Sequence, residues 1–130
     1  MRRQLTWIVS VCLLAIAGGF FGNAAGQDAK KKKTPTPAQM KIAEAISNGH
    51  AYQKHVVDEE QFPDVKSKTD FAKLIAGVLA NPTHHKELNK EREAFYDLPS
   101  NTIVIVNPRD KDRGTCFRPT AKKRYFDNLK

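Results

Sequence analysis

The fold is decided by residues 92–106, whose sequence is REAFYDLPSNTIVIV. Apolar and polar residues alternate from Arg92 to Leu98, Pro99-Ser100-Asn101 provides a turn, and a β-branched run follows from Thr102 to Val106. Alternation, a turn and a β-branched stretch are together typical of a β-hairpin. We expect the second strand of this hairpin to be central in a sheet.

Helices are predicted on the N-terminal side of the hairpin. A capping box at residues 36–39, with proline at the first helical position, begins a helix that Gly49 would end. Residues 50–58 form another helical stretch. The clearest helix follows, because Thr69 can cap a run with apolar residues at helical spacing that stops at Asn81-Pro82.

Strands and loops are predicted on the C-terminal side. Residues 107–114 form a charged loop, Thr115–Arg118 forms a third short strand, and Thr120–Leu129 is either a short helix or a fourth strand. Helices followed by antiparallel strands indicate an α+β domain, with N-terminal helices packed on a small antiparallel sheet of three to four strands. We place this single domain at residues 38–130.

The first 26 residues have the pattern of a secretory signal peptide. Arg2 and Arg3 precede an uncharged apolar run over residues 5–21, and small residues follow at 23–26. The alternative is an uncleaved anchor, although the run is at the short limit of about 17 residues for a membrane span. The sequence therefore predicts a secreted or periplasmic protein.

Residues 27–37 are expected to form a disordered tether. They contain four consecutive lysines and then Thr-Pro-Thr-Pro, with no apolar residue except Ala29. The lysine run suits a solvated linker better than a phosphate or membrane contact, since no aromatic residue is interleaved with it.

Composition narrows the function classes. The chain of 130 residues has 22 basic and 14 acidic residues, a formal charge of +8. Loss of residues 1–26 removes two arginines and no acidic residue, so the remaining chain has a net charge of +6. A positive net charge favours an anionic partner. The chain is too short for a doubly wound sheet and has no glycine-rich phosphate-binding pattern, so nucleotide-binding enzymes of that kind are excluded.

Two cysteines are too few for a disulfide scaffold or a four-cysteine zinc site. Cys116 is the only cysteine after residue 26, and we expect it to be a buried strand residue; the alternative is a reactive thiol or an intermolecular bridge. Tyr125 and Phe126 are expected in the core rather than as a base-stacking pair.

The densest group of candidate functional residues is the segment from Gly49 to His55. His50 and Lys54 are four residues apart and would share one helical face. A neutral imidazole beside a fixed ammonium suits general acid/base chemistry on a phosphodiester. The alternative, which is the commoner role of a surface histidine, is that His50 caps a helix end or is solvated. His55, five residues after His50, would point in another direction.

No metal site or cofactor is predicted. The spacing between His50 and His55 lacks the i, i+4 pattern with an intervening glutamate that binds zinc on a helix. His84 and His85 are adjacent and would diverge.

Arg92 and Thr115 are the remaining candidates. Arg92 could clamp a phosphate with its planar fork of donors, or form a surface ion pair with Glu93 or Asp97. Thr115 follows Gly114, where the backbone can approach a ligand and donate to an oxyanion; the alternative is an ordinary turn into a strand.

A succession of motifs resembles the toxin domains of the barnase/EndoU/colicin/RelE-like (BECR) ribonuclease superfamily, which often form the C-terminal tips of bacterial polymorphic and contact-dependent toxins. The motifs are Gly49-His50-Ala51-x-x-Lys54-His55-Val56, Arg92-x-Ala94-Phe95-Tyr96, residues 102–108, and Asp112-x-Gly114-Thr115-x-Phe117-Arg118-Pro119. The resemblance covers about residues 49–126. We expect this chain to differ from the usual toxin in being a stand-alone chain with its own signal peptide.

The resemblance implies an α+β fold and metal-independent cleavage of RNA by the ribose 2′-hydroxyl, which leaves a cyclic phosphate. It assigns His50 as the acid/base, Lys54 and Arg92 as stabilisers of phosphate charge, and Thr115 as a substrate contact. His55 becomes a candidate second acid/base. The implied partners are RNA and an immunity protein, for a monomer with no stable membrane association once the signal peptide is removed.

The sequence therefore predicts a secreted, metal-independent, ribonuclease-like enzyme without a cofactor. The alternative is a non-catalytic secreted or periplasmic module that binds an anionic polymer or a partner protein.

Overall fold

The computed structural model describes residues 30–130, so the predicted signal peptide and the first residues of the predicted tether lie outside the described residues. In chain order the elements are α1 (Pro37–Asn48), the π-helical segment η1 (Tyr52–Asp58), α2 (Lys68–Ala80), β1 (His84–Glu87), the short turn η2 (Asn89–Glu91), β2 (Glu93–Asp97), β3 (Thr102–Val106), β4 (Gly114–Phe117) and α3 (Lys123–Asn128). The α+β class is confirmed. Helices both precede and follow the strands, because the segment after residue 120 forms a helix rather than a strand.

The four strands form one antiparallel sheet in the order β1-β2-β3-β4. The predicted hairpin is confirmed as β2 and β3, and β3 is central because it pairs with β4 on its other side. Tyr96 of β2 is opposite Ile103 of β3, which is opposite Phe117 of β4. The turn between β2 and β3 is held by Asp97, whose carboxylate accepts the Ser100 N–H at 3.2 Å.

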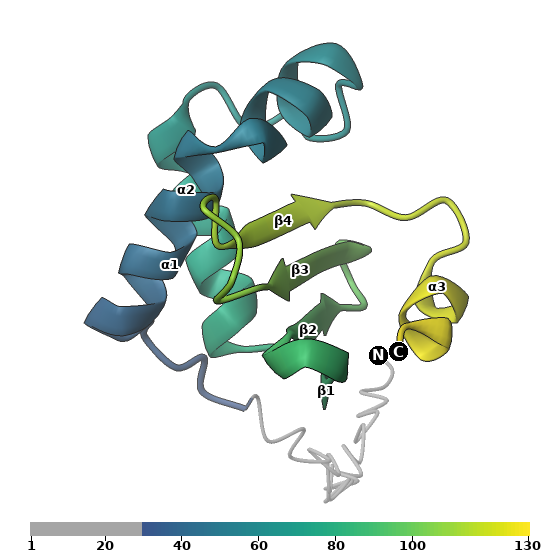
Figure 1. Cartoon of the computed structure of the whole chain (residues 1–130). Coiled ribbons are helices and arrows are strands. Elements are labelled where there is room, and N and C mark those ends of the chain that lie inside the picture. The colour runs from purple at the N-terminus through teal and green to yellow at the C-terminus, as the bar shows by residue number, and fades with distance from the viewer. Residues whose placement is uncertain (1–29) are drawn as a thin grey trace, which may run out of the picture. The chain divides into compact units, whose positions relative to one another are not determined.

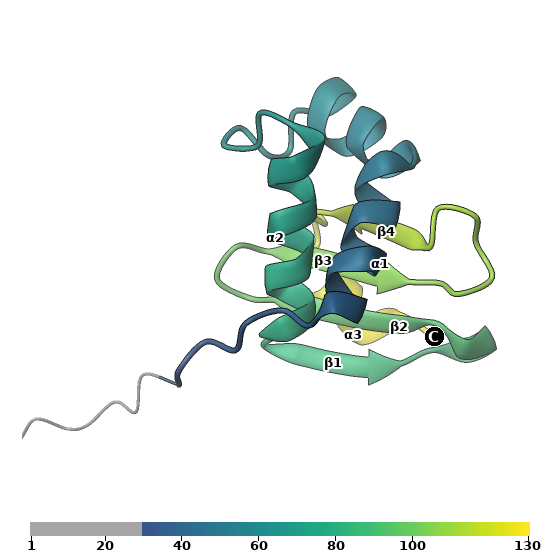
Figure 2. The same ribbon diagram turned by 90° about the vertical axis from the view of Figure 1, so that its left-hand side faces the viewer.

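Helices cover both faces of the sheet. In Figure 1, α1 and α2 lie side by side on one face and α3 lies on the other, and Figure 2 shows α1 and α2 in front of the strands. Side chains alternate between the faces of a strand. Val104 and Cys116 therefore join the core under α1 and α2, whereas Tyr96 and Ile103 join a second core with Phe126 of α3.

The ends of the helices follow local hydrogen bonding. The predicted capping box of α1 is confirmed: the Thr36 hydroxyl accepts the Gln39 N–H at 3.2 Å, and the Gln39 side chain accepts the Thr36 N–H at 2.9 Å. The prediction that Thr69 caps the next helix is wrong. Ser67 is the cap of α2, because its hydroxyl accepts the Asp70 N–H at 3.1 Å.

Strand β1 was not predicted. It consists of His-His-Lys-Glu and has no apolar alternation. The His84 ring stacks on Tyr96, 6.3 Å between centroids, whereas the His85 ring stacks on Phe95 at 4.4 Å. The two imidazoles thus point to opposite faces, as expected for adjacent residues, and take the place of apolar side chains.

Of the predicted tether at residues 27–37, the structure describes residues 30–37; residues 30–36 have no secondary structure and are mostly exposed, whereas Pro37 already begins α1. The Asn81 amide side chain pairs with the backbone of Lys33: its oxygen accepts the Lys33 N–H at 2.6 Å, and its nitrogen donates to the Lys33 carbonyl at 2.7 Å. No helix formed by residues 30–130 has the length and hydropathy to cross a membrane.

Candidate functional site

The candidate site is built around His50, at the junction between α1 and η1. Its Nδ1 lies 2.8 Å from Oδ2 of Asp112, and its backbone N–H donates to the same oxygen at 3.2 Å. Asp112 belongs to the loop between β3 and β4, 62 residues further along the chain. The pair therefore joins the end of the helical layer to the sheet.

In the His50–Asp112 pair the histidine is the hydrogen-bond donor and the carboxylate is the acceptor. Hydrogen bonds from the His50 ring and then from its backbone N–H hold the pKa of Asp112 below its usual range, and the nearby Lys111 adds to this effect. An ionised carboxylate only accepts hydrogen bonds, so Nδ1 carries the proton shared with Asp112. In the neutral ring, Nε2 is then the acceptor.

Exposure differs sharply across the pair. The His50 side chain is 51% exposed, whereas that of Asp112 is 17% exposed. A half-exposed imidazole oriented by a more buried carboxylate resembles in geometry the base and orienting group of many acid/base sites. The arrangement can move a proton at Nε2.

Gly49 makes the approach of Asp112 possible. A Cβ at residue 49 would lie 2.6 Å from both Cβ and Cγ of Asp112. The loop that carries Asp112 is itself tied down, because the Asp112 N–H donates to the Asp110 side chain at 3.2 Å and the Asn107 N–H donates to the Arg113 carbonyl at 2.8 Å.

Lys54 lies in η1, four residues after His50, and its side chain is exposed. Within residues 30–130 its ammonium has no hydrogen-bond or ion-pair partner. The segment is π-helical, with the Glu59 N–H donating to the Lys54 carbonyl at 3.0 Å. Such segments are rare and are found frequently at functional sites.

His55 is more enclosed than expected for a second acid/base. Its side chain is 9% exposed, and its Nδ1 lies 2.7 Å from Oε2 of Glu59. The ring packs on Phe117 of β4 at 5.4 Å between centroids. As predicted, His50 and His55 face different surroundings, one at each end of β4.

Thr115 lies in β4, opposite Ile105 of β3, and is half-buried. The Gly114 before it has a φ of 137°, and a Cβ there would lie 1.9 Å from the Ile105 carbonyl oxygen. The glycine is therefore required by the neighbouring strand, and the prediction that it lets the backbone approach a ligand has no support from this geometry.

Arg92 lies apart from His50. Glu93 pairs with Val106, and Val106 pairs with Gly114, so Arg92 lies at the same end of the sheet as the start of β4. Strand β3 lies between them, which separates Arg92 from β4 by two strand spacings, about 10 Å. Its guanidinium donates to the Asn89 carbonyl at 3.1 Å and to the Lys130 carbonyl at 2.9 Å.

The expected ion pair of Arg92 with Glu93 or Asp97 is wrong. The Glu93 carboxylate instead pairs with His85 at 2.8 Å, and that of Asp97 accepts the Ser100 N–H. The structure thus places His50 and Lys54 on one helical segment. His55 and Thr115 lie along β4, and the guanidinium of Arg92 is bonded to backbone carbonyls elsewhere.

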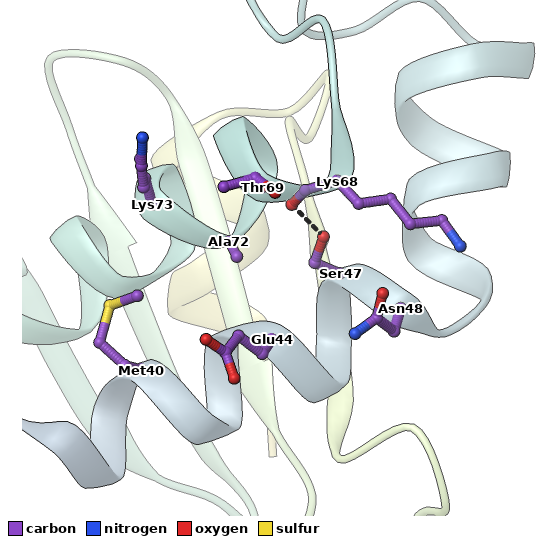
Figure 3. Close-up of a pocket in the computed structure, with 8 residues that line it drawn as sticks. All are labelled: Met40, Glu44, Ser47, Asn48, Lys68, Thr69, Ala72 and Lys73. Atoms are coloured by element: carbon purple, nitrogen blue, oxygen red, sulfur yellow. Dashed lines mark hydrogen bonds between the residues drawn. The ribbon is translucent and has the colours of Figure 1, made fainter.

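A groove of about 250 Å³ runs between α1 and α2 and contains none of these residues. Figure 3 shows its lining, in which the Ser47 hydroxyl donates to the Lys68 carbonyl. Within residues 30–130, histidine, cysteine and acidic side chains do not gather in threes around a point where a metal could bind. The titratable side chains that line the groove, Glu44, Lys68 and Lys73, have no hydrogen-bond partner within the described chain that would orient them, so the His50–Asp112 pair remains the candidate site.

Sequence reasoning missed the two carboxylates that orient the histidines. Asp112 lies in the motif that precedes Thr115, but the sequence indicates no role for its carboxylate, nor for that of Glu59. The signal available for Glu59 is its position four residues after His55 on a helical segment. Asp112 offers no such signal, because it lies 62 residues from His50.

Comparison of the sequence with models of known protein families gives no match, and comparison with curated proteins gives none either.

Proposed function

We propose that the exported chain is a ribonuclease-like enzyme that cleaves RNA through attack by the ribose 2′-hydroxyl, without a metal. The observation that carries this proposal is the half-exposed His50 ring held by Asp112. Its acceptor nitrogen is available to a substrate, while the carboxylate fixes the tautomer and orientation of the ring. The resemblance to the BECR superfamily points to the same residue.

In the proposed reaction Nε2 of His50 takes the proton of the 2′-hydroxyl. The 2′-oxygen forms a bond to phosphorus while the bond from phosphorus to the 5′-oxygen breaks. The departing 5′-oxygen takes a proton from solvent, which leaves a 2′,3′-cyclic phosphate and a 5′-hydroxyl. His50 then returns its proton to water. No redox partner or additional reactant is needed.

Lys54 would stabilise the charge that develops on the phosphate. It follows His50 by four residues on the same helical segment, is exposed, and makes no ion pair within the described chain. A positioned cation at developing negative charge is a major source of transition-state stabilisation. The enclosed position of His55 suits a residue that holds η1 against Phe117, so we assign proton transfer to His50 alone.

The test uses the chain from Gln27 to Lys130, since every buried core residue of the described chain lies between Ala43 and Phe126. Incubation with tRNA or total RNA in the presence of EDTA should yield fragments that end in a cyclic phosphate. We expect His50→Ala to slow cleavage by about 10²–10⁴-fold, the usual contribution of a general acid/base.

His85→Ala is the matched control. His85 is also an exposed histidine paired with a carboxylate, with Nε2 lying 2.8 Å from Glu93, but it lies in β1 at the opposite edge of the sheet from β4. This variant should cleave at the wild-type rate. The assignment of His50 as the catalytic base would be wrong if the wild type does not cleave RNA, or if both histidine variants lose the same share of the cleavage rate.

The second candidate is the non-catalytic binding module. It is favoured by the position of Arg92, whose donors are engaged by backbone carbonyls, since a dispersed set of residues argues against a single catalytic cleft. In the same assay this module would bind RNA or another polyanion without cleaving it, and His50→Ala would leave binding unchanged.

A further inference from the structure

The side chains of Tyr125 and Phe126 differ in burial, although both were expected in the core. Phe126 is 5% exposed and belongs to the core under α3, as predicted. Tyr125 is 39% exposed, so its prediction is wrong. Within residues 30–130 the other large apolar side chains left exposed are Val57 and Leu98, neither of which is aromatic.

The Tyr125 ring packs at the Phe117 end of β4, the end opposite to the His50–Asp112 pair. It meets Phe117 of β4 edge-to-face, with 5.4 Å between centroids and 88° between planes, and Phe117 in turn packs on His55 at 5.4 Å. Thr115 points to the same face of β4 as Phe117, two residues and about 7 Å away. A continuous row of rings thus leads from η1 across β4 to an exposed tyrosine.

Positive charges precede this ring. Lys122, Lys123 and Arg124 are consecutive, and Lys123 pairs with Asp127 at 2.7 Å. Lys122 and Arg124 are exposed, and neither has a carboxylate at ion-pair distance within the described chain. The backbone of Lys122 has a φ of 51° and a ψ of −137°, a conformation that a residue with a side chain adopts at a cost in energy and that is often found at ligand sites.

We infer that Lys122, Arg124 and Tyr125 form a binding subsite for single-stranded RNA. The exposed face of Tyr125 stacks on an unpaired base, and the two cations contact the phosphates on either side of it. An aromatic platform with adjacent cations is the combination by which proteins hold single strands without reading their sequence. The inference rests on the proposed function, because it takes RNA as the ligand, and it assigns these residues to holding the substrate rather than to breaking its bond.

The experiment measures binding apart from cleavage. A short fluorescent oligoribonucleotide carrying 2′-O-methyl groups has no free 2′-hydroxyl and cannot be cut by the proposed reaction, so fluorescence anisotropy with the chain from Gln27 gives its affinity. We expect Tyr125→Ala to weaken binding about tenfold or more, since a base stacked on an aromatic ring contributes that much. Tyr125→Trp should retain the affinity, because it keeps a stacking surface.

Two further variants test the role of charge. Arg124→Ala should lower the slope of log affinity against log salt concentration by about 0.7, the value for one phosphate contact on a single strand. Lys41→Ala removes the same charge from an exposed position of α1, on the other side of the sheet (Figure 1), and should leave affinity and slope near those of the wild type.

Inorganic polyphosphate, which has phosphates but no bases, should bind Tyr125→Ala as well as it binds the wild type. If Tyr125→Ala binds RNA as tightly as the wild type, the proposed subsite is wrong. It is also wrong if Tyr125→Ala loses RNA binding and polyphosphate binding to the same extent. Neither result would contradict the proposed function. A wild type that neither binds the oligonucleotide nor cleaves RNA would remove both. Circular dichroism of each variant excludes unfolding as the cause.

Discussion

Gly49 shows how a single missing side chain can shape the candidate site. Its φ of −82° and ψ of −162° are open to any residue, so the backbone does not require glycine. The requirement comes from Asp112, whose Cβ and Cγ would lie 2.6 Å from a Cβ at this position. Glycine therefore allows the carboxylate to reach both the ring and the backbone N–H of His50.

We predict that Gly49→Ala displaces Asp112 and slows RNA cleavage about tenfold or more while the fold is kept, because small misplacements of catalytic groups are costly. The control is Gly77→Ala in α2, where a Cβ has no atom within 4 Å. That change should leave cleavage unaltered and raise the free energy of unfolding by about 0.5–1 kcal/mol, as expected for alanine replacing glycine inside a helix. Cleavage by Gly49→Ala at the wild-type rate would show that the placement of Asp112 is unimportant.

Residue spacing predicted part of this site. His50 and Lys54 were found because four residues separate them on one helical segment, and the burial of Cys116 followed from its strand. Burial also raises the pKa of the Cys116 thiol, which leaves it protonated. The role of Asp112 was beyond reach, since it depends on how the loop after β3 is folded against the end of α1.

At the scale of elements, the start of α2 shows where local patterns fail. Ser67 and Thr69 are both suitable caps, and the sequence does not distinguish positions two residues apart. In the structure Ser67 has the extended φ of −147° that a cap requires, and Thr69 lies in the first helical turn. Strand β1 was not predicted because it lacks an alternating apolar pattern; its histidine rings stack on Phe95 and Tyr96 instead.

Ser67→Ala should lower the free energy of unfolding by about 1 kcal/mol, because the Asp70 N–H loses the hydroxyl that it donates to. Thr69→Ala should cause no loss, since Thr69 is exposed and alanine is the better helix former. Urea unfolding followed by far-ultraviolet circular dichroism measures both values. If the Thr69 variant is the less stable of the two, the capping role assigned to Ser67 is wrong.

At the scale of the whole molecule, contacts between distant residues hold the segment 50–61 along the outer edge of β4. His50 bonds to Asp112 at one end, and at the other the Arg118 N–H donates to the Gln61 side chain at 2.8 Å across 57 residues. In Figures 1 and 2 this segment lies beyond β4. It covers an edge that would otherwise be open to another strand, so the same segment protects the sheet and positions the candidate base.

Because Asp112 links segments that are 62 residues apart, its ionisation should contribute to the stability of the whole fold. Its folded pKa lies below the ordinary value of 3.8, so the unfolded state binds more protons in acid. The stabilisation is then fully present above about pH 5 and is lost as the pH falls through the folded pKa.

We therefore predict that Asp112→Asn lowers the free energy of unfolding at neutral pH, and that its difference from the wild type shrinks below the ordinary carboxyl pKa of 3.8 and then disappears. Urea unfolding at a series of pH values measures this difference. Asp64→Asn is the control, since Asp64 is exposed and forms no ion pair within residues 30–130. A difference for Asp112→Asn that stays constant down to the lowest pH would mean that the His50–Asp112 contact does not stabilise the charged carboxylate, and the orientation assigned to the His50 ring would lose its physical basis.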